Sequence, residues 1–284
     1  MTDQNDVMAP ERAEQLQDTL QTAVSAPPEP VMIHDIIRAD GERELERSVN
    51  ALSWSGLGAG LSMGFSFLML AVIRAYLPDS PWRILASSFG YTTGFMIVVL
   101  GRQQLYTEST LTAVLPVLTR RTPDSALKML RLWAVVLLAN IVGTFLFAWL
   151  MSMPDLFNGE VTLSLTEVGQ EALKDPFWPM AVKSMLAGWL IALMVWLMPS
   201  AGQSRLLLIL IITYTVAIGH FSHLIAGSVE VAYLVVTGQI SLGHYLGHFF
   251  IPTFVGNTVG GTSLVALLNH APVVEELHQS KGES

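Results

Sequence analysis

The apolar positions of this chain form six long runs, and polar residues interrupt two of them. The runs cover residues 52–77, 86–100, 132–151, 177–198, 206–218 with a continuation to 236, and 249–268. Because a helix needs about 20 residues to cross the hydrocarbon of a bilayer, the first, third, fourth and sixth runs are long enough alone. The second and fifth are too short, unless residues 111–118 and 229–236 complete them beyond the interruptions. The pattern therefore predicts six crossings, of which the second and fifth are broken helices.

The two interruptions are Gly101–Ser109 and Gly219–Gly227. A broken helix at membrane depth is tolerated only where protein or a water-filled cavity surrounds its free backbone groups. A pair of breaks at corresponding places in two halves of a chain indicates a binding site near the bilayer midplane. The pattern thus predicts a membrane protein with a polar pathway between its two halves.

Composition agrees with an integral membrane protein, since 51% of the residues are hydrophobic and 13% are charged. Four segments are predicted along the chain. Residues 1–35 are a disordered cytoplasmic tail, 36–50 an amphipathic helix on the inner membrane face, 51–270 the six-helix channel domain, and 271–284 a second cytoplasmic tail. Residues 36–50 are equally compatible with a plain solvated helix leading into the first span. No secretory signal is predicted, because the first apolar run begins at residue 52.

Basic residues predict which side of the membrane each loop faces, since Lys and Arg are enriched in cytoplasmic loops. The loop 152–175 carries acidic residues and one basic residue, Lys174, and is predicted to be external. Basic residues lie before the first run, between the second and third runs and after the fourth, namely Arg38, Arg43, Arg47, Arg120, Arg121, Lys128, Arg131 and Arg205. Both termini are therefore predicted to be cytoplasmic.

The two halves share a short motif with similar spacing. Asn140-Ile-Val-Gly and Asn257-Thr-Val-Gly lie in the third and sixth runs. Thr107 precedes Asn140 by 33 residues, and His223 precedes Asn257 by 34. Because each half holds three crossings, an odd number, the second copy is predicted to sit inverted in the membrane. The asparagines are expected to join helices rather than to bind a ligand, since amides hydrogen-bond across helix contacts.

Several classes of chemistry have little support in the sequence. The chain has no cysteine, and its apolar runs carry no Ser-His-Asp, paired-Asp or His-Glu-x-x-His constellation, so no enzyme and no cofactor are predicted. His244 and His248 have a spacing that permits metal binding, but a third ligand is lacking, and no metal site is predicted. An ionisable residue inside a membrane is functional by default, and His223 is favoured over His220 as the one that faces a pathway.

Several segments resemble the formate/nitrite transporter family, in the same order. They are Leu105–Thr107, Gly188–Trp196, Phe221–Ala226 and Pro252–Gly261, with the last the most specific. The likeness spans about Leu45 to His270 and is greatest to a divergent branch with similar Arg-Gln-Gln-Leu and Gly-Trp-Leu-Ile sequences. It implies an aquaporin-like, all-α fold of six transmembrane helices in two inverted repeats, assembled as a homopentamer in the bacterial inner membrane. The implied partners are a small anion or weak acid, lipid and further copies of the chain, without nucleic acid.

The resemblance also implies roles for individual residues. A small anion crosses hydrocarbon most easily as its neutral acid, because desolvating a charge is costly. Histidine suits the proton transfer, so His223 is expected to donate the proton, with Thr107 as its hydrogen-bonding partner. The other implied positions are the apolar constrictions Tyr91, Phe95, Leu105 and Val216. A basic residue that attracts anions in the family has no match in strict register, but Lys174 and Lys183 lie close enough to form a basic vestibule. A plain packing role remains an alternative for Tyr91, Phe95 and Val216.

The chain departs from the family pattern around the first break and before the central histidine. Bulky Arg102, Gln103 and Gln104 and the acidic Glu108 stand where small or neutral residues are usual, Ser222 replaces an acidic residue, and Gly188 replaces an asparagine that frames the site. Arg102 is expected to neutralise Glu108, or to pair within the loop or at a subunit contact, because buried ionisable groups need partners. The substrate therefore stays open, and a pathway for a cation or neutral solute, or a non-transporting scaffold or sensor, remains an alternative.

Overall fold

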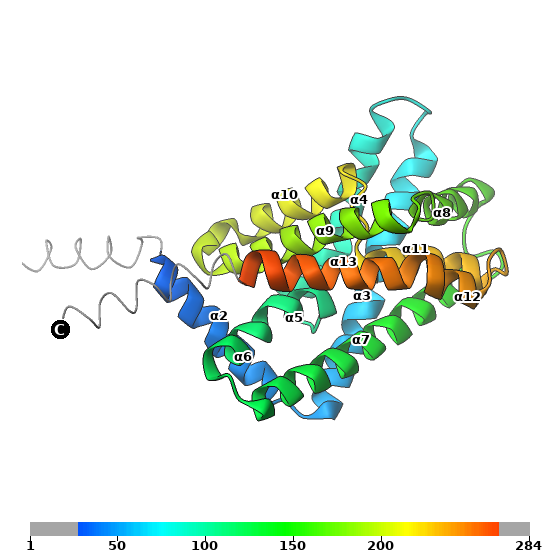
Figure 1. Ribbon diagram of the computed structural model, residues 1–284. Helices are drawn as coiled ribbons and strands as arrows, with labels where there is room; N and C mark the ends of the chain where they lie inside the picture. The colour runs from blue at the N-terminus through cyan, green and yellow to red at the C-terminus, as the bar shows by residue number, and fades with distance from the viewer. Residues whose placement is uncertain (1–27, 267–284) are drawn as a thin grey trace, which may run out of the picture.

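The computed structural model describes residues 28–266, and this part of the chain is built from helices without a strand. The predicted tails 1–35 and 271–284 lie outside the described residues except for residues 28–35. The helices are α2 (Pro30–Leu45), α3 (Val49–Tyr76), α4 (Arg83–Leu100), α5 (Tyr106–Thr112), α6 (Val114–Arg120), α7 (Pro123–Met151), α8 (Gly159–Ala172), α9 (Phe177–Leu197), η1 (Met198–Ser204), α10 (Arg205–Ile218), α11 (Leu224–Val236), α12 (Leu242–His244), η2 (Tyr245–Phe250), α13 (Ile251–Val259) and η3 (Gly260–Ala266). In Figure 1, α2 lies beside α6 at one end of the molecule, and α8 and α12 lie at the other.

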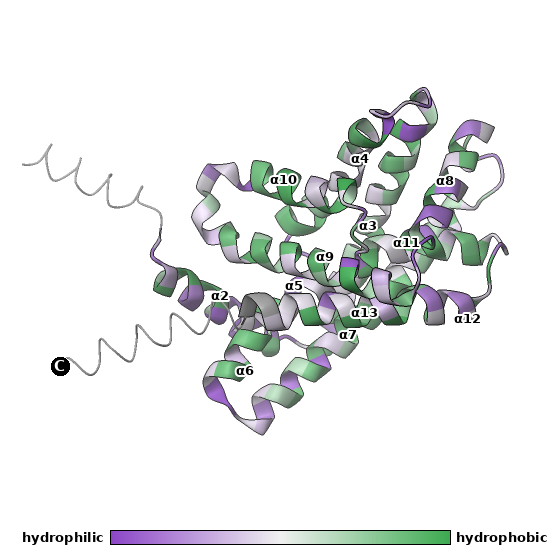
Figure 2. Cartoon of the chain, turned by 45° about the horizontal axis from the view of Figure 1, so that its top comes forward, coloured by the Kyte–Doolittle hydropathy of each residue, from purple (hydrophilic) through white to green (hydrophobic). Residues whose placement is uncertain are grey.

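Four helical stretches of the described residues are long and apolar enough to cross a membrane. They are α3, α4, α7 and the stretch Phe177–Ile218. The last one is two helices, α9 and α10, because the chain turns at Gly202, whose φ of 49° suits a residue without a Cβ. The predicted sixth run is α13, continued at both ends by the π-helical turns η2 and η3. Figure 2 shows hydrophobic residues along α9 and α10 and hydrophilic ones at α8 and at the turn between α6 and α7.

The N-terminal helix α2 begins and ends earlier than the predicted segment 36–50. Pro30 stands at its first turn, where a proline is favoured because its φ is already helical and no N–H is needed. Ser48 caps the next helix by accepting a hydrogen bond from the backbone of Ala51 at 3.3 Å, which ends the continuous stretch. One face of α2 is buried at four-residue spacing, through Ile33, Ile37, Gly41 and Leu45. This stripe packs α2 against α5, α6, α7 and α9.

The two interruptions have the same backbone geometry. The chain leaves the helix over residues 101–105 between α4 and α5, and over residues 219–223 between α10 and α11. Arg102 and His220 have φ values of 50° and 49°, a left-handed conformation that is unusual outside glycine. The next residue in each break donates its N–H back to the preceding helix: Gln103 to Val98 O at 3.0 Å, and Phe221 to Val216 O at 3.1 Å. The half-helices then begin after Leu105 and His223, each with an extended backbone.

Asn140 on α7 and Asn257 on α13 hold these breaks with matching hydrogen bonds. The Asn140 Oδ1 accepts from Tyr106 N at 2.9 Å, and the Asn257 Oδ1 accepts from Leu224 N at 2.8 Å. Their Nδ2 groups donate to two carbonyls each, those of Gly56 and Gln104 for Asn140 and those of Ser184 and Ser222 for Asn257. Backbone groups that a broken helix leaves free must find hydrogen-bond partners. The side-chain amides of Asn140 and Asn257 provide these partners at the two breaks. The prediction that both asparagines join helices is confirmed.

This geometry corrects the residue correspondence suggested by spacing. In the first break, Leu105 corresponds to His223. Each of them directly precedes the residue whose backbone N–H donates to the asparagine, Tyr106 in the first break and Leu224 in the second. Thr107 lies two residues further on, inside α5. The similar spacing to the two asparagines, 33 and 34 residues, would instead make Thr107 the counterpart of His223.

Gly188 lies where two helices cross. A Cβ at Gly188 on α9 would overlap the backbone oxygen of Asn257 on α13, and a Cβ at Gly60 on α3 would overlap that of Asn140 on α7. Absence of a side chain lets the backbones approach closely. The glycine that replaces the expected asparagine at residue 188 is therefore a packing position.

Candidate functional site

Thr107 and His223 meet between the two half-helices. The hydroxyl of Thr107 in the first turn of α5 lies 2.8 Å from the Nε2 atom of His223, and both side chains are buried. His223 also caps α11, since its Nδ1 atom accepts a hydrogen bond from the backbone N–H of Ala226 at 3.2 Å. Both nitrogens of the ring are thus engaged, one in each half of the chain.

These contacts determine the tautomer of His223. A ring nitrogen that accepts a hydrogen bond carries no hydrogen, so the neutral imidazole has its hydrogen on Nε2. Nε2–H then donates to Thr107 Oγ1, which leaves the hydrogen of the Thr107 hydroxyl free to point elsewhere. Adding a second proton to this ring requires breaking the contact between Nδ1 and Ala226. The geometry therefore makes the Thr107 hydroxyl a hydrogen-bond donor.

Apolar side chains surround this pair. The ring of Phe95 meets that of His223 edge to face, with centroids 5.0 Å apart, and Tyr91 lies 5.3 Å from Phe95. Leu105 and Val216 are buried in the same apolar core as Tyr91 and Phe95. The four predicted constriction residues thus belong to one apolar core, and Phe95 in this core contacts the ring of His223.

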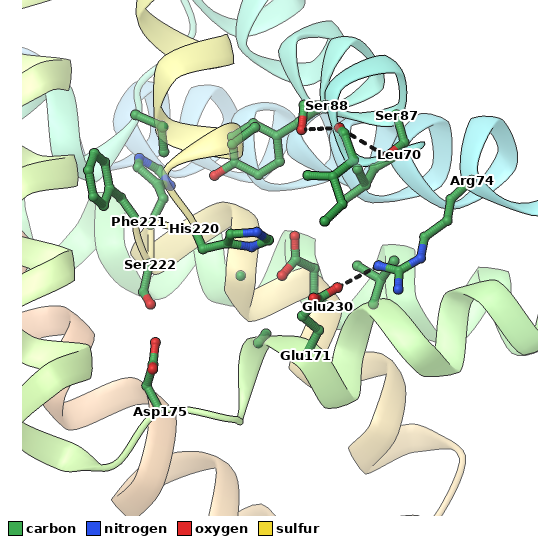
Figure 3. A pocket seen from close by; sticks show the side chains of 18 of the residues that line it. Leu70, Arg74, Ser87, Ser88, Glu171, Asp175, His220, Phe221, Ser222 and Glu230 are labelled. Atoms are coloured by element: carbon green, nitrogen blue, oxygen red, sulfur yellow. Dashed lines mark hydrogen bonds and ion pairs between the residues drawn. The ribbon is translucent and has the colours of Figure 1, made fainter. Parts of the chain in front are cut away.

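A cavity of about 110 Å³ reaches His223 from the α8 end of the molecule. Tyr91 and Val216 line its wall, whereas Thr107, Phe95 and Leu105 do not. Figure 3 shows this space, with Glu171 at one end and Ser222 at the other. The cavity therefore ends at His223.

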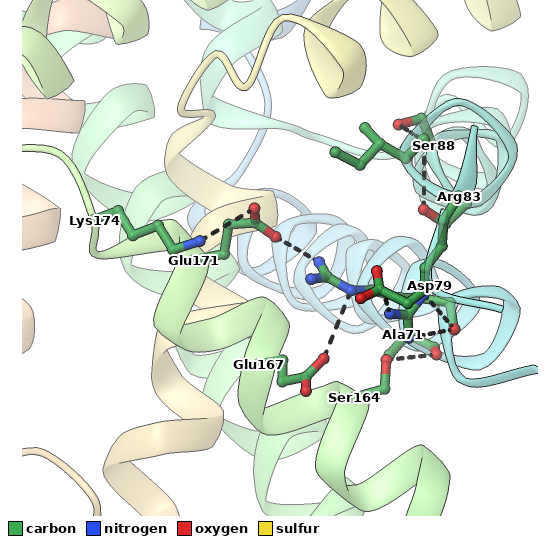
Figure 4. Close-up of polar contacts among 11 residues, drawn as sticks. Ala71, Asp79, Arg83, Ser88, Ser164, Glu167, Glu171 and Lys174 are labelled. Atoms are coloured by element: carbon green, nitrogen blue, oxygen red, sulfur yellow. Dashed lines mark hydrogen bonds and ion pairs between the residues drawn. The ribbon is translucent and has the colours of Figure 1, made fainter. Parts of the chain in front are cut away.

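The two lysines predicted to form a basic vestibule are each paired with a carboxylate. Lys174 lies 3.5 Å from Glu171, and Lys183 lies 2.7 Å from Asp175. Glu171 also receives a 2.5 Å hydrogen bond from Arg74 on α3 (Figure 4). Glu171 and Asp175 line the cavity, and the lysines stand behind them. Each lysine therefore has a carboxylate partner, and Glu171 is shared between Lys174 and Arg74.

The expected neutralisation of Glu108 by Arg102 is wrong. The Arg102 side chain is 81% exposed and lies 3.8 Å from Asp40 on α2, so it pairs outside the loop. The left-handed backbone of Arg102 belongs to the break, whereas Glu108 belongs to the first turn of α5. The Oε1 atom of Glu108 is buried without a hydrogen-bond partner in the described residues. The two charged side chains therefore take separate directions.

The sequence interpretation did not include Glu44, which α2 brings to the first break. Its carboxylate accepts hydrogen bonds from Gln104 Nε2 at 3.0 Å and Thr112 Oγ1 at 2.7 Å. Burial raises the pKa of the Glu44 carboxyl group, although these two hydrogen bonds act in the opposite direction. Only the periodicity of α2, which places Glu44 beside buried Leu45 and Gly41, indicated that this face is covered.

His244 and His248 stack with ring centroids 4.9 Å apart, and His248 contacts Leu173 O at 3.1 Å. Within residues 28–266, no group of three or more His, Cys, Asp or Glu residues is placed to hold a metal ion.

Sequence comparison identifies the family. The family described as Formate/nitrite transporter matches residues 31–271. The chain is 40% identical to the inner membrane protein YfdC of Escherichia coli, over 90% of this chain and 82% of that protein. It is 25% identical to the formate channel FocA of Haemophilus influenzae, over 75% of this chain and 83% of that protein. The chain is thus a membrane protein of the channel and transporter class. It belongs to the formate/nitrite transporter family.

Solved structures show the same fold. A pentameric formate channel with formate bound matches with a TM-score of 0.68 at 20% identity, over 80% of this chain and 98% of that one. An ion channel of the formate/nitrite transporter family matches with a TM-score of 0.75 at 20% identity, over 84% of this chain and 98% of that one. These relatives are transport proteins, in agreement with the prediction that the chain is not an enzyme.

Proposed function

We propose that this chain forms a pore for a small monovalent anion, such as formate or nitrite, or for its conjugate weak acid. The main support for this proposal is the contact between Thr107 and His223. It lies between two broken helices, where the cavity ends. A formate channel among the relatives supports the substrate class.

We propose six membrane crossings in two inverted repeats. The support is the repeated geometry of the breaks, in which Asn140 and Asn257 each accept from one half-helix amide and donate to two carbonyls. The fifth and sixth crossings would be α10 with α11, and α13 with its π-helical turns. The basic segments support cytoplasmic termini, with α2 inside and α8 outside.

We further propose a homopentamer, with one pore in each protomer. A pentameric structural neighbour supports this assembly. Large apolar side chains are exposed along the membrane-crossing helices, among them Leu138, Val142, Leu146 and Trp149 on α7. In the assembled protein these surfaces would contact lipid or another protomer.

In the proposed pathway, the permeant binds in the cavity and then passes the apolar constriction in a separate step. The anion would enter the cavity, take up a proton near His223 and cross the apolar side chains as the neutral acid, because the charged form pays a large desolvation cost there. The free hydrogen of Thr107 would hold the permeant next to His223, beyond the end of the cavity. Phe95 and Leu105 would form the constriction beyond it.

A cation pathway is the second candidate. The observation that favours it is the pair of acidic side chains inside the helical bundle, Glu108 and Glu230, each without a cation partner among residues 28–266. An anion and a cation respond oppositely to these charges, so transport measurements separate the two candidates.

The test is flux into proteoliposomes that contain the purified protein. The panel comprises formate, nitrite, a monovalent cation and an uncharged solute of similar size. We expect the weak acids to enter and the cation to be excluded. Cation uptake without weak-acid uptake would establish the second candidate, and no uptake of any solute would establish a non-transporting scaffold.

A further inference from the structure

The cavity wall contains one carboxyl group that no cation neutralises. Glu230 lies on α11, and only 9% of the residue is exposed. Among residues 28–266 it has no hydrogen-bonding or ion-pair partner. The other two carboxylates of the wall are paired, Glu171 with Arg74 and Lys174, and Asp175 with Lys183. Glu230 therefore differs from them in having neither solvent exposure nor a counterion.

The side chain of Glu230 lies within the space that leads to His223. In Figure 3 its carboxyl group points toward the ring of His220, and both residues line the cavity. The same wall contains charged or titratable groups from three helices and the break. These are Arg74 on α3, Tyr91 on α4, Glu171 at the end of α8 with Asp175 beyond it, and His220 and His223 in the break; η2 contributes the uncharged Phe249.

The charge state of Glu230 decides what the cavity admits. An ionised carboxylate here would be buried without compensation and would repel an entering anion. A protonated carboxyl group has neither disadvantage, and it presents a hydrogen to the anion. The cavity of about 110 Å³ exceeds the space of about 10 to 15 Å³ that one water needs. Water in this space can return a proton to the carboxyl group from outside.

Building on the proposed function, we propose that Glu230 exchanges a proton with the permeant weak acid in the cavity before the permeant reaches His223. The O–H bond of the Glu230 carboxyl group breaks, and an O–H bond forms on the permeant anion. Glu230 remains as a carboxylate and regains a proton that water in the cavity relays from the external solution. The neutral acid then passes to Thr107, whose hydroxyl holds it while His223 stays neutral.

The first test measures how formate uptake into proteoliposomes depends on external pH. Glu230→Gln keeps the size and polarity of the side chain but cannot exchange a proton. We expect formate uptake by the wild type to rise as the external pH falls. In Glu230→Gln we expect this rise to disappear and formate uptake to be lower by about tenfold or more. The matched control is Glu167→Gln on α8, which changes a 40% exposed carboxylate outside the cavity. It should retain the wild-type profile. A wild-type profile in Glu230→Gln would overturn the proposal.

A second measurement does not depend on flux. Infrared difference spectra during a pH titration report the carbonyl stretch of a protonated carboxyl group. We expect a titrating band in the wild type and in Glu167→Gln that is missing from Glu230→Gln and that shifts when formate is added. Absence of this Glu230 band would overturn the proposal even if formate is transported. If the wild type carries no weak acid, the proposed function fails, while the titration still decides whether Glu230 exchanges protons.

Discussion

The hydroxyl of Thr107 lies 2.8 Å from Nε2 of His223, joining two half-helices across 116 residues of sequence. Because the other ring nitrogen of His223 accepts a hydrogen bond from Ala226 N–H, the neutral imidazole carries its hydrogen on Nε2 and leaves the threonine hydrogen available. The Thr107 hydroxyl is therefore a hydrogen-bond donor among apolar side chains.

Removing the Thr107 hydroxyl should weaken both the fold and transport. Thr107→Val leaves the buried Nε2–H of His223 unsatisfied, which costs about 1 to 3 kcal/mol. We expect a lower melting temperature in detergent and a lower formate flux, and near-normal behaviour for Thr107→Ser, which keeps the hydroxyl. Thr119→Val removes a threonine hydroxyl near the end of α6 and serves as the control. Equal melting temperatures and fluxes for Thr107→Val and the wild type would rule out a role for the hydrogen bond.

Replacing His223 by asparagine should separate passage from proton uptake. Asparagine can cap α11 as His223 does, so the half-helix is retained. We expect His223→Asn to reduce formate flux at every pH without moving the midpoint of the pH profile. His220→Asn should keep most of the flux. A shifted midpoint with undiminished maximal flux in His223→Asn would instead make His223 the proton donor.

The two asparagines should contribute similarly to stability, because each satisfies one backbone amide and two carbonyls. Asn140→Ala and Asn257→Ala each leave several buried groups unpaired, at about 1 to 3 kcal/mol per group. We expect a large fall in the melting temperature for both. Asn158→Ala, which removes the cap of α8, should cost only about 1 kcal/mol. A mild effect in one half and a severe effect in the other would contradict the repeated geometry.

A side chain at Gly188 should force α9 and α13 apart. The missing Cβ would overlap the backbone of Asn257, and overpacking costs about 1 to 3 kcal/mol. We therefore expect Gly188→Ala and Gly188→Asn to lower the melting temperature. Gly159→Ala, at a position with nothing within 4 Å of the added carbon, should not. Full stability of Gly188→Asn would show that the expected polar residue fits here.

The contact of α2 with the first break should weaken as pH rises. Burial raises the pKa of the Glu44 carboxyl group above its value in the unfolded chain. The stabilisation is then fully present below the unfolded pKa and is lost as pH rises through the folded pKa. We expect hydrogen exchange in α2, corrected for its intrinsic pH dependence, to become faster over this interval in the wild type. Glu44→Gln should remove the pH dependence, and an equal dependence in both proteins would exclude Glu44 as its source.

The pattern of apolar residues alone predicted the long apolar helices and the places where two of them break, but not α8, which lies in a segment read as a loop. Apolar runs and their polar interruptions depend on residues that are close in the chain, and the structure retains both breaks. The resemblance to a family further identified Thr107 and His223, and the structure brings these two side chains into contact. The motif around Asn140 and Asn257 correctly indicated helix-joining amides.

Only the tertiary structure decided which charged groups meet. Arg102 and Glu108 are six residues apart, yet Arg102 lies beside Asp40 on α2, and Glu108 lies in α5 without a partner in the described residues. Lys174 and Lys183 read as anion-attracting in the sequence, and their carboxylate partners neutralise them. Within residues 28–266, Glu230 lacks such a partner because α11 places it in a wall whose cations are already paired. Hydrophobic patterning is a local property, whereas the surroundings of a charge depend on elements that are distant in the chain.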